Sequence, residues 1–199
     1  AELNLRTRRI AVVAADKGWD FESPRYSPDG GRIAFTAAHL GLKHTMPSQL
    51  AVLERGARWR VLSADWDHAV HAPLRWDDDG QSLCFTAEDH ARNHLWRFDL
   101  RQRRATQVVT GGWVQSFDLA SGVLVSAADA MDHPARVHAQ RDGEAPRRLE
   151  RFNDELLATL RLGEHEDLRF KGAQGDEEQM WVVYPPGFDA RKTYPLLHS

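Results

Sequence analysis

The sequence predicts an all-β chain made of repeated four-stranded antiparallel sheets, the blades of a partial β-propeller. Three segments carry the same strand–turn–strand pattern, and neighbouring copies start roughly forty to fifty residues apart, which is about the length of one blade. Within each copy, apolar residues alternate with small or polar ones, as in a half-buried strand. We expect about three to four blades. The copies are RYSPDGGRIAFTA (25–37), LRWDDDGQSLCFTAED (74–89) and the degraded SFDLASGVLVSAAD (116–129).

The turn inside each copy contains residues that tight turns prefer. Pro28 presets one backbone dihedral, Asp29 can bond its own backbone, and Gly30-Gly31 accept a positive φ. The second copy repeats this chemistry at Asp79-Gly80. Each copy therefore predicts a hairpin that joins the first two strands of a blade.

The other strands follow from the same alternation along the chain. The apolar run 9–15 predicts a strand that closes a further blade, and the segment 94–100 predicts a strand with one apolar face. The predicted blades are blade A at 21–65, blade B at 66–110 and blade C at 111–162. Packing between blades accounts for most of the tryptophans, namely Trp59, Trp76, Trp96, Trp113 and Trp181.

After Phe152 the repeat pattern ends. The leucines at 156–162 suit either a short helix or a continued strand, and the sequence leaves both open. Two further strands are predicted at 168–171 and 179–184, followed by a break at 185–187, where Pro-Pro-Gly cannot continue a ladder. A third apolar start follows at 194–197. These residues predict a new architectural unit.

Composition excludes several classes of partner. The net charge of -3 does not favour nucleic acid or an anionic membrane, and the basic run Arg101–Arg104 is interpreted as a solvated hairpin. The single cysteine, Cys84, lies in an apolar strand, where a packed side chain is expected rather than a nucleophile. No apolar run reaches the roughly eighteen residues of a membrane helix. We expect a soluble protein of the cytoplasm or the periplasm, and a piece of a longer chain.

The histidines and aspartates raise the question of a metal site. His90 and His94 have the i, i+4 spacing of a metal-binding helix, but they lie in a predicted hairpin loop. The stretch 65–73, which holds His68 and His71, is interpreted as a structural turn. Asp77-Asp78-Asp79 lacks the further acids of a calcium loop. We therefore predict no metal and no cofactor.

The segment from 147 to 197 resembles the prolyl oligopeptidase family of serine peptidases, and most closely its acylaminoacyl-peptidase and dipeptidyl-peptidase branch. The resemblance implies that residues 1–165 form the C-terminal part of a propeller. It also implies that 166–199 begin an α/β-hydrolase domain, ahead of its His-Gly-Gly and nucleophile motifs. The residues that stand at the family positions are Asn153, Gly175, Trp181, Pro185, Pro186, Phe188, Tyr194 and Pro195.

The resemblance also implies where the chemistry is located. The chain contains no Gly-x-Ser-x-Gly elbow, so the Ser-Asp-His triad is expected downstream, with no catalytic residue here and no activity from this chain alone. His198 and Ser199 are interpreted as residues of the hydrolase sheet. The expected substrates are short peptides, and the propeller is expected to control their access to the active site. In dipeptidyl-releasing relatives an acidic propeller residue holds the free amino group of the peptide, and the candidates here are Glu88, Asp89, Asp129 and Asp132.

A non-enzymatic, TolB-like propeller that binds proteins is the alternative. It explains the repeats equally well, but it gives no reason for the segment 176–197. In either case an open propeller exposes strand edges and apolar blade faces, so we expect the isolated chain to associate with itself.

Overall fold

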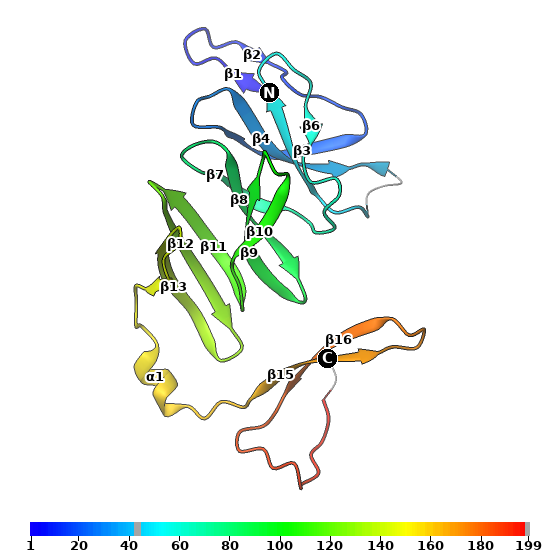
Figure 1. Ribbon diagram of the computed structural model, residues 1–199, viewed down its shortest axis with the longest axis vertical. Coiled ribbons are helices and arrows are strands. Elements are labelled where there is room, and N and C mark those ends of the chain that lie inside the picture. The colour runs from blue at the N-terminus through cyan, green and yellow to red at the C-terminus, as the bar shows by residue number, and fades with distance from the viewer. Residues whose placement is uncertain (42–44, 198–199) are drawn as a thin grey trace. The chain divides into compact units, whose positions relative to one another are not determined.

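A computed structural model describes residues 1–41 and 45–197 (Figure 1). The chain divides into two compact units. The first unit consists of Ala1–Ala130 with Ala135–Glu150, and the second contains Met131–Pro134 and the chain from Arg151 onward. Nearly all regular structure is antiparallel β, as the sequence predicts.

Three blades follow one another in the chain. The strands of blade A are β3 (Trp19–Tyr26), β4 (Arg32–His39), β5 (Gln49–Glu54) and β6 (Arg60–Val61), hydrogen-bonded in that order. Those of blade B are β7 (His71–Trp76), β8 (Ser82–Asp89), β9 (Arg92–Asp99) and β10 (Arg104–Val109). Those of blade C are β11 (Trp113–Ala120), β12 (Val123–Ala130), β13 (His133–Arg141) and β14 (Arg147–Arg148).

The predicted turn chemistry is confirmed in the first hairpin of blade A. The Ser27 N–H donates to the backbone oxygen of Arg32, the backbone oxygen of Ser27 accepts from the Gly30 N–H, and Gly30 has a φ of 67°. The Asp29 side chain accepts from the Gly31 N–H at 2.9 Å. The Ser27 hydroxyl and this N–H hold the pKa of Asp29 below its usual value, because both stabilise the carboxylate.

Each blade also has a bulge in its first strand, which alternation alone does not reveal. The register shifts between Glu22 and Arg25 in β3, and between His71 and Arg75 in β7. It shifts again between Val114 and Ser116 in β11. A bulge bends a strand and re-aims the side chains beside it, so the three blades share a device that redirects their first strands.

The core lies between the blades, and this corrects the prediction for 94–100. Trp96 and Phe98 of β9 join one buried cluster with Leu74 and Phe85. Leu95, which points to the other face of β9, is also fully buried, in a cluster with Phe117 and Leu124 of blade C. Both faces of β9 are covered because the strand is enclosed by neighbouring blades.

The N-terminal prediction is wrong in its detail. The apolar run 9–15 contributes only β2 (Ile10–Ala11), which pairs with β1 (Glu2–Leu3) in a separate two-stranded sheet. It closes no blade. Ile10 is 72% exposed, whereas Val13 and Ala14 pack against blade A.

The second unit settles the ambiguous stretch after Phe152. Residues Asp154–Thr159 form the six-residue helix α1, so the first of the two interpretations is confirmed. A hairpin of β15 (His165–Lys171) and β16 (Glu177–Val183) follows, close to the two predicted strands. The predicted strand at 194–197 is wrong, because those residues have no regular structure. In the described part of the chain no helix is long and apolar enough to cross a membrane.

Candidate functional site

Two of the four predicted acidic residues lie in one row across the junction of blades B and C. Glu88 of β8 is the register partner of Asn93 in β9, and Asn93 pairs with Trp113 in β11. Trp113 in turn pairs with Asp129 in β12. Register partners share a sheet face, and strands lie about 4.8 Å apart, so the Cα atoms of Glu88 and Asp129 are roughly 14 Å apart. We call these four residues the junction row.

Asn93 is the buried member of the junction row and joins the two blades. Its Nδ2 donates to the backbone oxygen of Val114 at 2.6 Å, and the residue is only 8% exposed. This bond fixes the orientation of the amide, because only the nitrogen can donate. Among the described atoms its Oδ1 has no hydrogen-bond partner. A buried amide oxygen without a partner favours a ligand that brings an N–H donor.

The carboxylate of Asp129 is held from one side. Gln115 Nε2 donates to Asp129 Oδ2 at 2.6 Å. Gln115 is the residue at the bulge of β11, so the irregularity in that strand aims the amide at the carboxylate. Glu88, by contrast, is exposed, and its carboxylate forms no hydrogen bond or ion pair with the described residues.

Trp113 differs from its prediction. It was expected to pack in the core, but it is 43% exposed at the start of β11. Its place in the junction row puts this accessible aromatic residue one strand from Asp129 and two strands from Glu88. An aromatic face flanked by carboxylates attracts a cation.

The carboxylate of Asp89, at the end of β8, already has two side-chain partners. Its Oδ2 accepts from Gln107 Nε2 at 3.2 Å, and its Oδ1 lies 2.7 Å from His90 Nδ1. These contacts fix the end of the β8–β9 hairpin. Asp132 lies in the β12–β13 turn, which belongs to the second unit; its side chain is 61% exposed and lies 3.8 Å from His133 Nε2. The structure therefore groups only Glu88 and Asp129 in the row.

The histidines are arranged as a hairpin rather than as a helix. His90 and Ala91 form the β8–β9 turn, both with positive φ, but His94 is a buried residue of β9 rather than of the loop. Burial lowers the pKa of His94, with Asp89 opposing the shift. Within residues 1–41 and 45–197, no group of three or more His, Cys, Asp or Glu side chains is placed to hold a metal ion. His198 and Ser199 lie outside the described residues.

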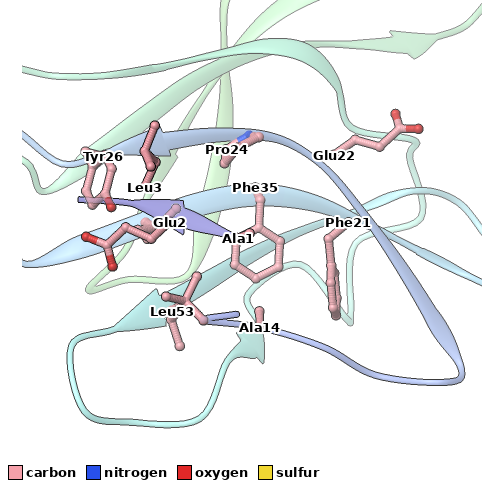
Figure 2. Close-up of a pocket in the computed structure, with 12 residues that line it drawn as sticks. Ala1, Glu2, Leu3, Ala14, Phe21, Glu22, Pro24, Tyr26, Phe35 and Leu53 are labelled. Atoms are coloured by element: carbon pink, nitrogen blue, oxygen red, sulfur yellow. The ribbon is translucent and has the colours of Figure 1, made fainter. Parts of the chain in front are cut away.

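A pocket of about 250 Å³ lies elsewhere, beside blade A (Figure 2). Its lining includes the apolar Phe21, Phe35 and Leu53, together with Glu2 and Tyr26. It opens where the N-terminal segment covers the face of the blade, and none of the predicted site residues lines it. We interpret it as a packing gap of that face.

Comparison with known proteins identifies relatives of this chain. Over 184 residues the chain is 32% identical to a protein named probable dipeptidyl-peptidase 5 from Arthroderma benhamiae. The matched segment makes up 87% of this chain and 25% of that protein. The chain is related to the prolyl oligopeptidase family of peptidases. It spans about a quarter of the length of the curated relatives that it matches. No protein-family model matches it.

Solved structures show the same fold for this peptidase-related chain. An acylaminoacyl peptidase from Pyrococcus horikoshii superposes with a TM-score of 0.65 at 20% identity, over 79% of this chain and 24% of that one. The β-propeller domain of the trilobed protease from Pyrococcus furiosus superposes with a TM-score of 0.54 at 20% identity, over 66% of this chain and 38% of that one. TolB from Acinetobacter baumannii superposes with a TM-score of 0.50 at 14% identity, over 84% of this chain and 44% of that one. At these identities the matches establish the propeller fold alone.

Sequence reasoning found the acids of the junction row but missed its centre. Asn93 stands between Arg92 and His94 at the start of β9, so no apolar pattern marked it as a buried residue. Trp113 was misassigned because a tryptophan in a strand is usually a core residue.

Proposed function

We propose that this chain is the non-catalytic propeller portion of a serine peptidase that cleaves short peptides, releasing a dipeptide or an acylated amino acid. The observation that supports it most is the 32% identity over 184 residues to a protein named as a dipeptidyl-peptidase. In this proposal the catalytic Ser, Asp and His lie beyond residue 199, and the hairpin of the second unit begins the hydrolase domain.

The chain's own residues supply binding and exclusion rather than bond cleavage. A propeller that covers the active site excludes large folded substrates and admits short peptides. The sequence holds no Gly-x-Ser-x-Gly elbow. Residues 1–199 alone are therefore expected to be inactive, since a triad needs its nucleophile, base and orienting acid together.

The junction row is the proposed site for the amino terminus of the peptide. An ammonium group carries three N–H donors. Glu88 and Asp129 offer charged acceptors, the unpartnered Oδ1 of Asn93 offers a third, and the exposed ring of Trp113 attracts the same charge. Asp89 supports this end of the site through its contacts with Gln107 and His90. Asp132 stays a candidate in the second unit.

A TolB-like protein-binding module is the second candidate, and the similarity to TolB favours it. Deleting 167–199 separates the two candidates. A self-sufficient binding module should fold as well without these residues, whereas a peptidase propeller should not be a clean monomer with or without them, because its blade edges stay open.

The deciding experiment uses the protein as it occurs in its source cells. An antibody to this chain recovers the native protein, which is then treated with a fluorophosphonate probe for activated serines. We expect a labelled band several times heavier than 22.6 kDa that hydrolyses aminoacyl or dipeptidyl chromogenic substrates. An unlabelled protein of this mass would overturn the proposal and favour the binding module. Serine-dependent turnover by residues 1–199 alone would contradict the location of the triad.

A further inference from the structure

The outermost strand of every blade begins with an arginine. Arg60 opens β6, Arg104 opens β10 and Arg147 opens β14. Each of these arginines is the first residue of its strand after the hairpin that joins the third and fourth strands of its blade. The repeat is separate from the strand–turn–strand motif that defines the blades, since it falls in their other half.

Each of these outer hairpins holds two further arginines, so that three hairpins carry three arginines apiece. Most of the nine side chains are exposed, and only Arg148 is half-buried. We call this set the arginine rim; it consists of Arg55, Arg58 and Arg60 in blade A, Arg101, Arg103 and Arg104 in blade B, and Arg141, Arg147 and Arg148 in blade C.

Direct contacts link the outer strands and hairpins of neighbouring blades. Arg103 Nη2 of blade B donates to the backbone oxygen of Leu62, the residue that follows β6 of blade A, at 3.2 Å. On the other side, Arg97 Nη1 of blade B lies 2.8 Å from Asp142 in the β13–β14 turn of blade C. The three arginine groups therefore lie on adjoining blades of the first unit.

Several of these guanidinium groups have no hydrogen-bond or ion-pair partner among the described residues. Arg58, Arg101, Arg104 and Arg147 make no side-chain hydrogen bond or ion pair with the residues that the structure describes. Arg60, by comparison, pairs with Glu54 at 3.1 Å. Each blade thus presents at least one unengaged guanidinium, and none of these four is needed to hold its hairpin together.

The rim is cationic in a chain that is anionic overall. The net charge of the chain is -3. The three segments 54–60, 99–104 and 141–150 nevertheless hold the nine rim arginines and only five acids, Glu54, Asp99, Asp142, Glu144 and Glu150. Folding has gathered basic residues that are dispersed in the sequence. A cationic surface of this kind attracts and orients an anionic partner.

We infer that the arginine rim is a docking surface for an acidic polypeptide segment of a partner protein. A guanidinium fork matches a carboxylate with two parallel hydrogen bonds. Acids interleaved with the arginines disfavour a polyanion as densely charged as duplex nucleic acid, which carries a charge about every 1.7 Å along its axis. The hairpin tips carry Gly56, Ala57 and Gln102 instead of large apolar side chains, which disfavours insertion into a lipid surface.

The test uses the whole protein as it occurs in its source cells and a fluorescein-labelled decaglutamate peptide, with binding followed by fluorescence anisotropy at fixed ionic strength. The rim variant combines Arg58→Glu, Arg104→Glu and Arg147→Glu. The matched control combines Arg6→Glu, Arg8→Glu and Arg9→Glu, three exposed arginines near β2. Circular dichroism melts establish that each protein is folded. Because the side chains of Arg58, Arg104 and Arg147 have no partner among the described residues, the rim variant should melt close to the wild type, as should the control.

We expect the rim variant to bind decaglutamate at least tenfold more weakly than the wild type, while the control changes less than threefold. Equal losses in the two triple variants would overturn the proposal, because net charge rather than the rim would then govern binding. Tighter binding of the wild type to single-stranded DNA or to anionic vesicles than to decaglutamate would also overturn it, in favour of those partners. A misfolded rim variant is replaced by its single substitutions, whose summed losses must still exceed those of the control.

Discussion

Trp76 of blade B donates its indole N–H to the backbone oxygen of Arg25 in blade A, at 3.0 Å. Arg32 of blade A reaches back, donating to the backbone oxygen of Gly80 at 2.7 Å, with its guanidinium 5.2 Å from the Trp76 ring centre. All four residues belong to the repeated strand–turn–strand motif. The residues that fold each hairpin therefore also join it to its neighbour.

Replacing Trp76 with Phe should lower the free energy of unfolding by about 1–2 kcal/mol. The substitution keeps an aromatic ring but removes the N–H donor, which leaves the Arg25 carbonyl without its partner. Urea denaturation measures the change. The control is Trp113→Phe, which is 43% exposed and should change stability by less than about 0.5 kcal/mol. Equal effects of the two substitutions would mean that the blade-to-blade hydrogen bond contributes nothing.

Gly112→Ala should destabilise the start of blade C by roughly 1–3 kcal/mol. A Cβ at Gly112 would collide with the backbone oxygen of Asp129, so the β11–β12 pairing must shift. Gly18→Ala is the matched control, because a Cβ there meets only the Asp16 side chain at an ordinary 3.5 Å. Thermal melts of both variants test this, and similar melting temperatures would contradict it.

The pH dependence of stability should show the burial of His94. Burial lowers the pKa of His94 in the folded state, so below its ordinary value of about 6.5 the unfolded state binds more protons. Stability from this residue is present above that pH and is lost on acidification. Urea unfolding at pH 8 and pH 5.5 should show the free energy of wild type falling relative to His94→Leu. Parallel changes in the two proteins would contradict the prediction.

In the whole protein, Glu88→Gln and Asp129→Asn should each raise KM for dipeptidyl substrates about tenfold, with kcat little changed. Each substitution removes a charged acceptor for the peptide ammonium, an interaction of about 1.5–3 kcal/mol. The N-acetylated forms of the same substrates lack that charge and should be affected less than threefold. Asp78→Asn, in the turn at the opposite end of β8, is the control and should leave both unchanged. A larger effect on the acetylated substrates would exclude this role of the junction row.

Local patterns accounted for the hairpins of each blade. Pro28, Asp29 and Gly30 fix a turn whatever surrounds it, and that turn forms as predicted. Predictions failed where burial depends on a neighbouring element. The strand 94–100 was predicted to have one apolar face, yet blade C also covers Leu95 on its other face. The run 9–15 looked like a full strand, but only Ile10 and Ala11 find a partner.

The sequence by itself determined the repeat, the strands of each blade and the acids at the ends of their second strands, because these depend on residues close together in the chain. Tertiary structure decided that Glu88 and Asp129 share one row with Asn93 and Trp113, and that the arginines of three hairpins lie on adjoining blades. Strand register across blades and the packing of one blade on the next join residues that are distant in sequence, so no local pattern encodes them.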